Sequence, residues 1–113
     1  MDPEKVKKGE EERLLGRFPT NSGEVVALTR EGKGLGSREL ARFLQERMVR
    51  SVPSVTFVIG GAFGLGEGVL KRSTLRLRIS RMTLPHDLAR LFLVEQLYRA
   101  GTITRNEPYH KGP

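Results

Sequence analysis

Two glycine-rich segments have spacings that invite comparison with nucleotide-binding loops. The first, Gly32 to Gly36, matches neither a Walker A loop nor the G-x-G-x-x-G dinucleotide motif, because Ser37 stands where the last glycine would be. A flexible turn before a helix explains it better. The second, Gly60-Gly61 with Gly64, follows an apolar run and precedes a helix, so its backbone could approach a ligand closely. It indicates a nucleotide-like ligand without naming one.

The chain has no cysteine and only two histidines, His86 and His110. Thiol nucleophiles, disulfides and cysteine-based zinc or iron–sulfur sites are excluded, and a histidine-rich metal centre is disfavoured. The missing Walker A loop and the shortage of aspartate disfavour a nucleotide hydrolase. We therefore expect no metal.

Most of the excess positive charge lies in the last two fifths of the sequence. Lysine and arginine outnumber acidic residues by 20 to 13, which gives a net charge of +7. Residues 68–113 hold nine basic and three acidic side chains, a net of +6. Such a basic segment favours a polyanionic partner, most often nucleic acid, over a merely solvated arginine-rich surface.

We expect one cytoplasmic domain over residues 1–113. The N-terminus has no apolar run that would make a secretory signal. The longest apolar stretch, residues 55–65, contains three glycines and is far shorter than the ~20 residues of a membrane-spanning helix. A length of 113 residues fits a single domain with a modest core.

Helical and strand patterns alternate along the chain. Ser37 is a good N-cap, Pro53 closes the segment after it, and Pro85 suits a first helical turn. Hydrophobic periodicity predicts helices over 3–16, from Ser37 onward, 67–72 and 86–100, strands over 25–29, 55–59 and 75–79, and a glycine-rich loop over 31–36.

The connections are too long for hairpins, so the sheet should be parallel and the fold class α/β with flanking helices. The runs 25–29 and 55–59 are apolar without alternation, as in strands covered on both faces. Leucine and arginine alternate over 75–79, which predicts an edge strand. Ligands bind beyond the carboxyl ends of such strands, here after Leu28, Ile59 and Ile79.

The last helix carries apolar residues on more than one face. Leu88, Leu91 and Phe92 form one stripe, while Leu93 and Val94 fall outside it. We interpret the second face as a homodimer interface, because a small fold has little interior for a whole helix. The alternative is a helix buried centrally in its own domain.

Five ordered motifs give the sequence a resemblance to a known family. They are Val58-Ile59-Gly60-Gly61, Gly64-Leu65, Met82-Thr83-Leu84-Pro85-His86, Glu95-Gln96-Leu97-Tyr98-Arg99-Ala100 and Tyr109-His110-Lys111. Over residues 3–111 the chain resembles the RlmH-type ribosomal RNA methyltransferases of the SPOUT class.

The resemblance implies a function and a fold. The family methylates N3 of a pseudouridine in large-subunit ribosomal RNA with S-adenosylmethionine, and it acts as a homodimer on the ribosome's large subunit. It folds as an α/β domain with a C-terminal trefoil knot. Here, residues 1–24 would form the N-terminal helix and turn, and residues 25–113 the knotted cofactor-binding core.

The resemblance also implies the site residues. The cofactor would lie among the knot loops, against Leu28, Gly60, Gly61, Ile79, Ser80, Arg81, Met82, Thr83 and Leu84. For Met82 and Leu84 ordinary core packing is the alternative, and for Ser80 and Thr83 it is helix capping.

The same resemblance implies catalytic and RNA-binding side chains. The catalytic candidates are His86, Arg99, Tyr109 and His110, with histidine the natural proton acceptor and the terminal segment closing over cofactor or RNA. The alternatives are a helix-start role for His86 and a salt bridge to Glu95 for Arg99. Contacts to the RNA backbone would come from Arg72, Arg76, Arg78, Arg81, Arg90, Arg105 and Lys111.

The chain departs from the family at its N-terminus. Members usually have a strand–helix–strand before the segment that matches residues 3–16. A truncation or a natural minimal form would each leave an uncovered sheet edge or an exposed apolar helix face. Two hypotheses from other classes are an inactive RNA- or ribosome-binding dimeric module of the same fold, and a structural dimer whose glycine loops only turn corners.

Overall fold

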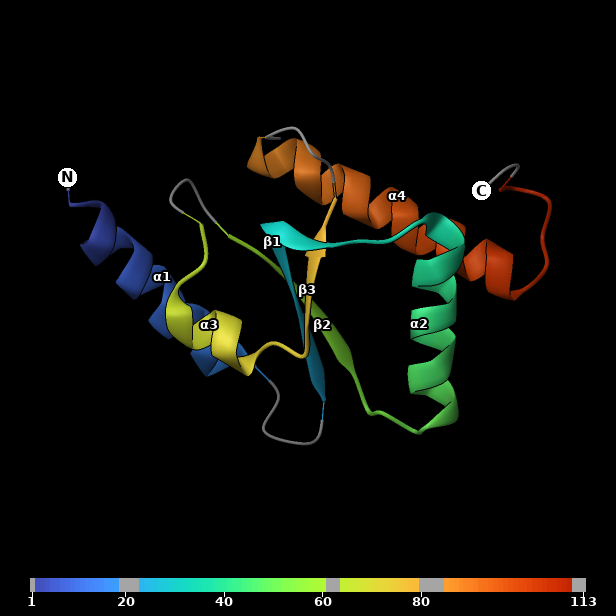
Figure 1. The fold of residues 1–113 in the computed structure, drawn as a ribbon, viewed down its shortest axis with the longest axis horizontal. Helices are drawn as coiled ribbons and strands as arrows, with labels where there is room; N and C mark the ends of the chain where they lie inside the picture. Colours follow the sequence, from blue (N-terminus) through green and yellow to red (C-terminus); the bar gives the residue numbers. More distant parts are fainter. Residues whose placement is uncertain (1, 19–22, 61–63, 80–84, 111–113) are drawn as a thin grey trace.

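The computed structural model describes residues 2–18, 23–60, 64–79 and 85–110 (Figure 1). The predicted alternation of helices and strands is confirmed, and the third helix spans the predicted residues. In chain order the elements are α1 (Pro3–Arg17), β1 (Glu24–Gly34), α2 (Ser37–Val49), β2 (Val55–Ile59), α3 (Glu67–Arg72), β3 (Leu75–Arg78) and α4 (His86–Thr104).

Within these residues three parallel strands pair in the order β2-β1-β3. The central strand β1 is covered on both faces, so Val25, Val26 and Ala27 have no exposed surface. β3 pairs with β1 and lies at an edge of the described sheet, as the alternation of leucine and arginine predicts. The α/β class and the parallel sheet are therefore confirmed.

Helices cover the two faces of the sheet as separate pairs, α1 with α3 and α2 with α4 (Figure 1). Each pair packs over its own apolar cluster. The buried residues on the α1–α3 side are Val25, Ala27, Val58, Leu65 and Val69, with Leu14, Phe18 and Leu70 packed against them. The buried residues on the α2–α4 side are Leu40, Ala41 and Ala100, with Leu44, Phe57 and Ile103 packed against them.

The prediction of a glycine-rich loop over 31–36 is wrong in part, because β1 continues to Gly34. Leu77 of β3 is the register partner of both Leu28 and Lys33. The chain therefore leaves β3 after Leu28, arches over residues 29–32 and pairs again from Lys33. The arch passes close to β3, since a Cβ on Gly32 would lie 2.6 Å from the carbonyl carbon of Leu77.

The knot stays a prediction, because residues 80–84 of its implied loop lie outside the described residues. In the described ranges, no helix combines the length and apolar character that crossing a membrane requires.

Helix α4 extends beyond the predicted end, to Thr104, and it is not buried centrally in its own domain. Leu93 and Ala100 are buried against the rest of the chain, while Leu88, Leu91 and Val94 are exposed. The sequence interpretation assigns the second face, with Leu93 and Val94, to another subunit. That assignment is wrong for Leu93, which meets the core, whereas the first stripe of Leu88, Leu91 and Phe92 is the exposed one.

The close approach of the arch to β3 gives a stability prediction. Gly32→Ala should lower the free energy of unfolding by about 1–3 kcal/mol, because the new methyl group meets backbone that cannot rotate away. Gly16→Ala in α1 is the matched control, since a Cβ there meets nothing within 4 Å and should stabilise the helix by up to about 1 kcal/mol. Urea unfolding measures both; equal stability of the two variants would contradict the prediction.

Candidate functional site

The carboxyl ends of the three strands meet at one edge of the sheet. Leu28 is in register with Ile59 of β2 and with Leu77 of β3. Gly60 follows Ile59 directly, and Ile79 follows the end of β3. The structure therefore brings together the three strand ends at which the sequence predicts ligand binding. Gly61 and residues 80–84 of the predicted cofactor set lie outside the described residues.

Gly60 and Gly64 are needed by the chain's own turn. A Cβ at Gly60 would lie 2.8 Å from the carbonyl carbon of Gly64 and 3.0 Å from the amide nitrogen of Leu65. Gly64 has a φ of +80°, which side-chain-bearing residues rarely adopt. The missing side chain at Gly60 thus makes room for backbone, where the sequence interpretation expects room for the cofactor.

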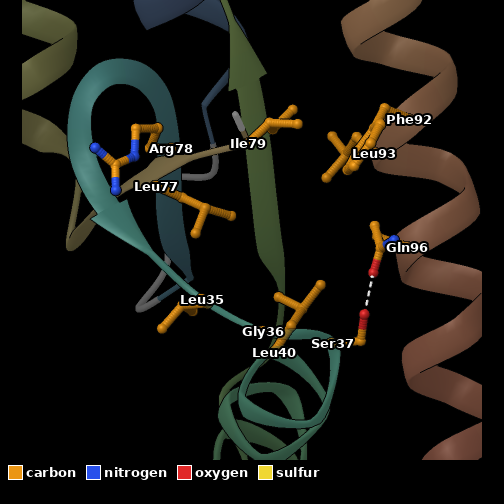
Figure 2. Close-up of a pocket in the computed structure, with 10 residues that line it drawn as sticks. All are labelled: Leu35, Gly36, Ser37, Leu40, Leu77, Arg78, Ile79, Phe92, Leu93 and Gln96. Atoms are coloured by element: carbon orange, nitrogen blue, oxygen red, sulfur yellow. Dashed lines mark hydrogen bonds between the residues drawn. The ribbon is translucent and has the colours of Figure 1, made fainter. Parts of the chain in front are cut away.

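An apolar cavity of about 370 Å³ lies beside this edge, between the start of α2, the end of β3 and α4 (Figure 2). Figure 2 shows Ile79 on one side, facing Phe92 and Leu93 of α4 on the other. The residues that line it are Leu35, Gly36, Ser37, Leu40, Leu77, Arg78, Ile79, Phe92, Leu93 and Gln96. Its size and its apolar walls with few polar groups are those of a small-molecule site.

A side-chain hydrogen bond joins α2 to α4 across this cavity (Figure 2). The Ser37 hydroxyl donates to Oε1 of Gln96 at 2.6 Å. Ser37 is therefore not the N-cap that the sequence predicts: Gly36 holds that position, and its amide donates to the Glu39 carboxylate at 3.0 Å. The Glu39 carboxylate caps the start of α2, and the Ser37 side chain lines the cavity instead.

Three of the four predicted catalytic side chains lie together near the C-terminal end of α4. Arg99 donates from Nε and Nη2 to Oε1 of Glu95, at 3.0 and 2.7 Å, and its Nη1 lies 3.0 Å from Nδ1 of His110. Tyr109 donates to the same Glu95 oxygen at 3.3 Å and packs edge-to-face on Tyr98. The salt bridge to Glu95 that was the alternative for Arg99 therefore exists alongside its contact with His110.

Charge pairing sets the ionisation of this cluster. The hydrogen bond from Arg99 is the main reason that the pKa of the Glu95 carboxyl lies below its ordinary value. The same hydrogen bond raises the pKa of Arg99 further above its ordinary value. Both groups are thus charged at neutral pH, and Glu95 accepts a further hydrogen bond from Gln96 Nε2 at 3.1 Å.

His86 does not belong to the cluster. It is the first residue of α4, and Arg99 follows 13 positions later, which is about 20 Å along a helix. Its side chain is half exposed, its Nδ1 lies 3.8 Å from Asp87, and it lines a smaller cavity with α1 and Ile59.

The predicted RNA-binding arginines lie on several elements. Arg76 and Arg78 are on β3, Arg90 is on α4, and Arg72 ends α3, where it donates to the Gly23 carbonyl at 3.4 Å. Arg105, after α4, pairs with Glu107, which offsets its charge locally. Arg81 and Lys111 lie outside the described residues.

Neither Ser37 nor Gln96 is predicted from the sequence as a cavity residue. The spacing of four residues predicts the pair of Glu95 and Arg99, which the structure confirms. It does not predict that Gln96 and Tyr109 share the Glu95 carboxylate. In the part of the chain that the structure describes, no group of three or more His, Cys, Asp or Glu residues could hold a metal ion.

The sequence matches known proteins over nearly the whole chain. A family model described as "Predicted SPOUT methyltransferase" matches residues 1–110. A protein of Carboxydothermus hydrogenoformans is 48% identical over 110 residues, 97% of this chain and 69% of the relative. One of Syntrophotalea carbinolica is 45% identical over 96% of this chain and 69% of its own length, and one of Clostridioides difficile is 48% identical over 94% and 66%.

All three relatives are named ribosomal RNA large subunit methyltransferase H. This chain spans about two thirds of their length. Because the family model covers nearly all of its residues and the identity approaches one half, the chain belongs to the SPOUT methyltransferase family.

Proposed function

We propose that this chain is an S-adenosylmethionine-dependent methyltransferase that acts on N3 of a pseudouridine in large-subunit ribosomal RNA. The observation that carries the proposal is its identity of 45–48% to the relatives of that name, over at least 94% of its length. The proposed substrate puts the reaction in the cytoplasm, on the ribosome's large subunit or its RNA.

The described residues fit such a cofactor. The cavity beside Ile79 offers the aliphatic and aromatic walls that a purine and a thioether chain pack against, and Ser37 and Gln96 offer polar contacts. Leu28, the last residue of β1 before the arch, and Gly60, directly after β2, would contribute backbone groups. When bound, S-adenosylmethionine supplies an activated methyl group on a positively charged sulfur.

The chain's own task is mainly orientation. N3 of the base must face the methyl carbon in line with the bond that breaks, and such alignment is worth several orders of magnitude in rate. Tyr109 and His110, held on α4 by Arg99 and Glu95, are the side chains proposed to orient the base. Arg76 and Arg78 lie on the edge strand β3, where Arg78 also lines the cavity, and both would hold the RNA backbone.

The proposed assembly is a homodimer that covers the exposed face of α4. Leu88, Leu91 and Val94 are exposed at successive three-residue steps along that helix. Because large apolar side chains grouped on one side of a helix mark interaction surfaces, they support an isologous contact between two copies.

Methylation of RNA tests the proposed function directly. The chain is incubated with S-adenosylmethionine and either pseudouridylated or unmodified large-subunit RNA, and nucleosides are analysed by mass spectrometry. We expect N3-methylpseudouridine only from the pseudouridylated RNA.

A cavity-filling variant tests the cofactor site. Ile79→Trp should weaken the binding of S-adenosylmethionine at least about tenfold, because a clash removes most of the packing free energy.

For cofactor binding, Val49→Trp is the matched control, since Val49 ends α2 on the exposed surface.

In the methylation assay, RNA binding without methylated product at millimolar cofactor would contradict the proposal and favour the inactive RNA-binding module.

The salt dependence of RNA binding tests the role of β3. The double variant Arg76→Gln/Arg78→Gln should reduce the slope of log Kd against log salt by about 1.4–1.8. Each phosphate contact that forms releases about 0.7–0.9 of a counterion, and the variant lacks two such contacts. Arg38→Gln/Arg42→Gln on the exposed surface of α2 is the control and should leave the slope unchanged. Equal slopes for both variants would mean that β3 does not contact RNA.

Sedimentation tests the dimer. Leu91→Glu should convert dimer to monomer, because Leu91 is 66% exposed in the single chain and a charge there would be buried between two copies. Val49→Glu, at 78% exposure on α2, should sediment like the unaltered protein. If Leu91→Glu leaves the sedimentation coefficient unchanged, the interface lies elsewhere.

A further inference from the structure

A chain of hydrogen bonds connects the cavity wall to the segment after α4. It runs from Ser37 to Gln96, from Gln96 to Glu95, from Arg99 to the same carboxylate, and from Arg99 to His110. Glu95 is its centre, because one of its oxygens accepts from Gln96 and the other from Arg99 and Tyr109. One carboxylate therefore fixes the terminal segment relative to the cavity.

The contact between Arg99 and His110 determines where the imidazole carries its proton. A guanidinium has only donors and stays protonated. Its Nη1 lies 3.0 Å from Nδ1 of His110, so Nδ1 must be the acceptor. A neutral imidazole with a free lone pair on Nδ1 carries its hydrogen on Nε2. A doubly protonated ring would direct an N–H at the guanidinium and is disfavoured by both sterics and charge.

The Nε2 atom is shielded from solvent, and no group among the described residues accepts a hydrogen bond from it. A nitrogen that already carries a hydrogen and has no accessible surface cannot take a proton from a base, and Nδ1 is occupied by Arg99. Neither ring nitrogen of His110 is therefore available as a general base.

We propose that Glu95 is a positioning residue which, through Arg99, holds His110 as its Nε2–H tautomer, so that His110 orients the terminal segment and cannot take the N3 proton during methyl transfer. The proton acceptor for N3 is then a group other than His110. The catalytic half of this inference rests on the proposed function, whereas the tautomer does not.

Nitrogen NMR of the imidazoles tests the tautomer on the full chain. Only two histidines give signals, and His86→Gln assigns them. We expect His110 to show a protonated Nε2 and an unprotonated Nδ1 at pH 7–8. Glu95→Ala, which frees Arg99, should yield a mixture of tautomers. Glu107→Ala is the matched control, because Glu107 pairs with Arg105 in the same segment and outside the network.

A protonated Nδ1 or a doubly protonated His110 in the unaltered protein would overturn the inference. So would an unchanged single tautomer in Glu95→Ala.

Replacement of His110 tests whether it is the base. A glutamine keeps hydrogen-bonding groups of similar reach but cannot take up a proton at neutral pH. His110→Gln should therefore keep a kcat within about tenfold of the unaltered chain, since the loss of a general base costs about 10²–10⁴. A fall of about 10² or more would overturn this part of the inference. If the unaltered chain does not methylate RNA, the proposed function fails while the NMR result still decides the tautomer.

Discussion

The fold depends on the passage of β3 beside the arch of β1. Leu77 is in register with Leu28 and again with Lys33, so one short strand is bound by two separate parts of β1. Gly32 makes this possible, because its missing side chain lets the arch approach the backbone of Arg76 and Leu77. After the arch the chain reaches the start of α2, and the cavity lies where the start of α2, the end of β3 and α4 meet.

Helix α4 serves three surfaces at once, which explains why its sequence has no single apolar stripe. Leu93 and Ala100 pack toward α2 and the sheet, and Leu88 and Leu91 face outward. Glu95 and Arg99, one helical turn apart, hold the segment that follows the helix. A helix with one partner would place polar residues where these leucines stand.

The sequence predicts the elements, the parallel sheet and its edge strand well, because each depends on local periodicity and on glycine or proline at element ends. It misses the extension of β1 to Gly34, since a strand that leaves and rejoins its neighbour is fixed by the distant Leu77 and not by local residues. It also misassigns Ser37, whose partner Gln96 lies 59 positions away. The close packing around Gly60 is also beyond local prediction, because the backbone that fills the space of its missing side chain comes from the turn at Gly64.

The Arg99 side chain shows how the site restricts its own chemistry. The sequence leaves open whether Arg99 forms a salt bridge or contacts substrate. In the structure its Nε and Nη2 are directed to Glu95 and its Nη1 to His110, so most of its donor fork is committed within the chain. A guanidinium held in this way has few N–H groups left to bind a phosphate. It is well suited to orient an imidazole, because the planar group is fixed at Nε and Nη2 and the direction of Nη1 is then fixed as well.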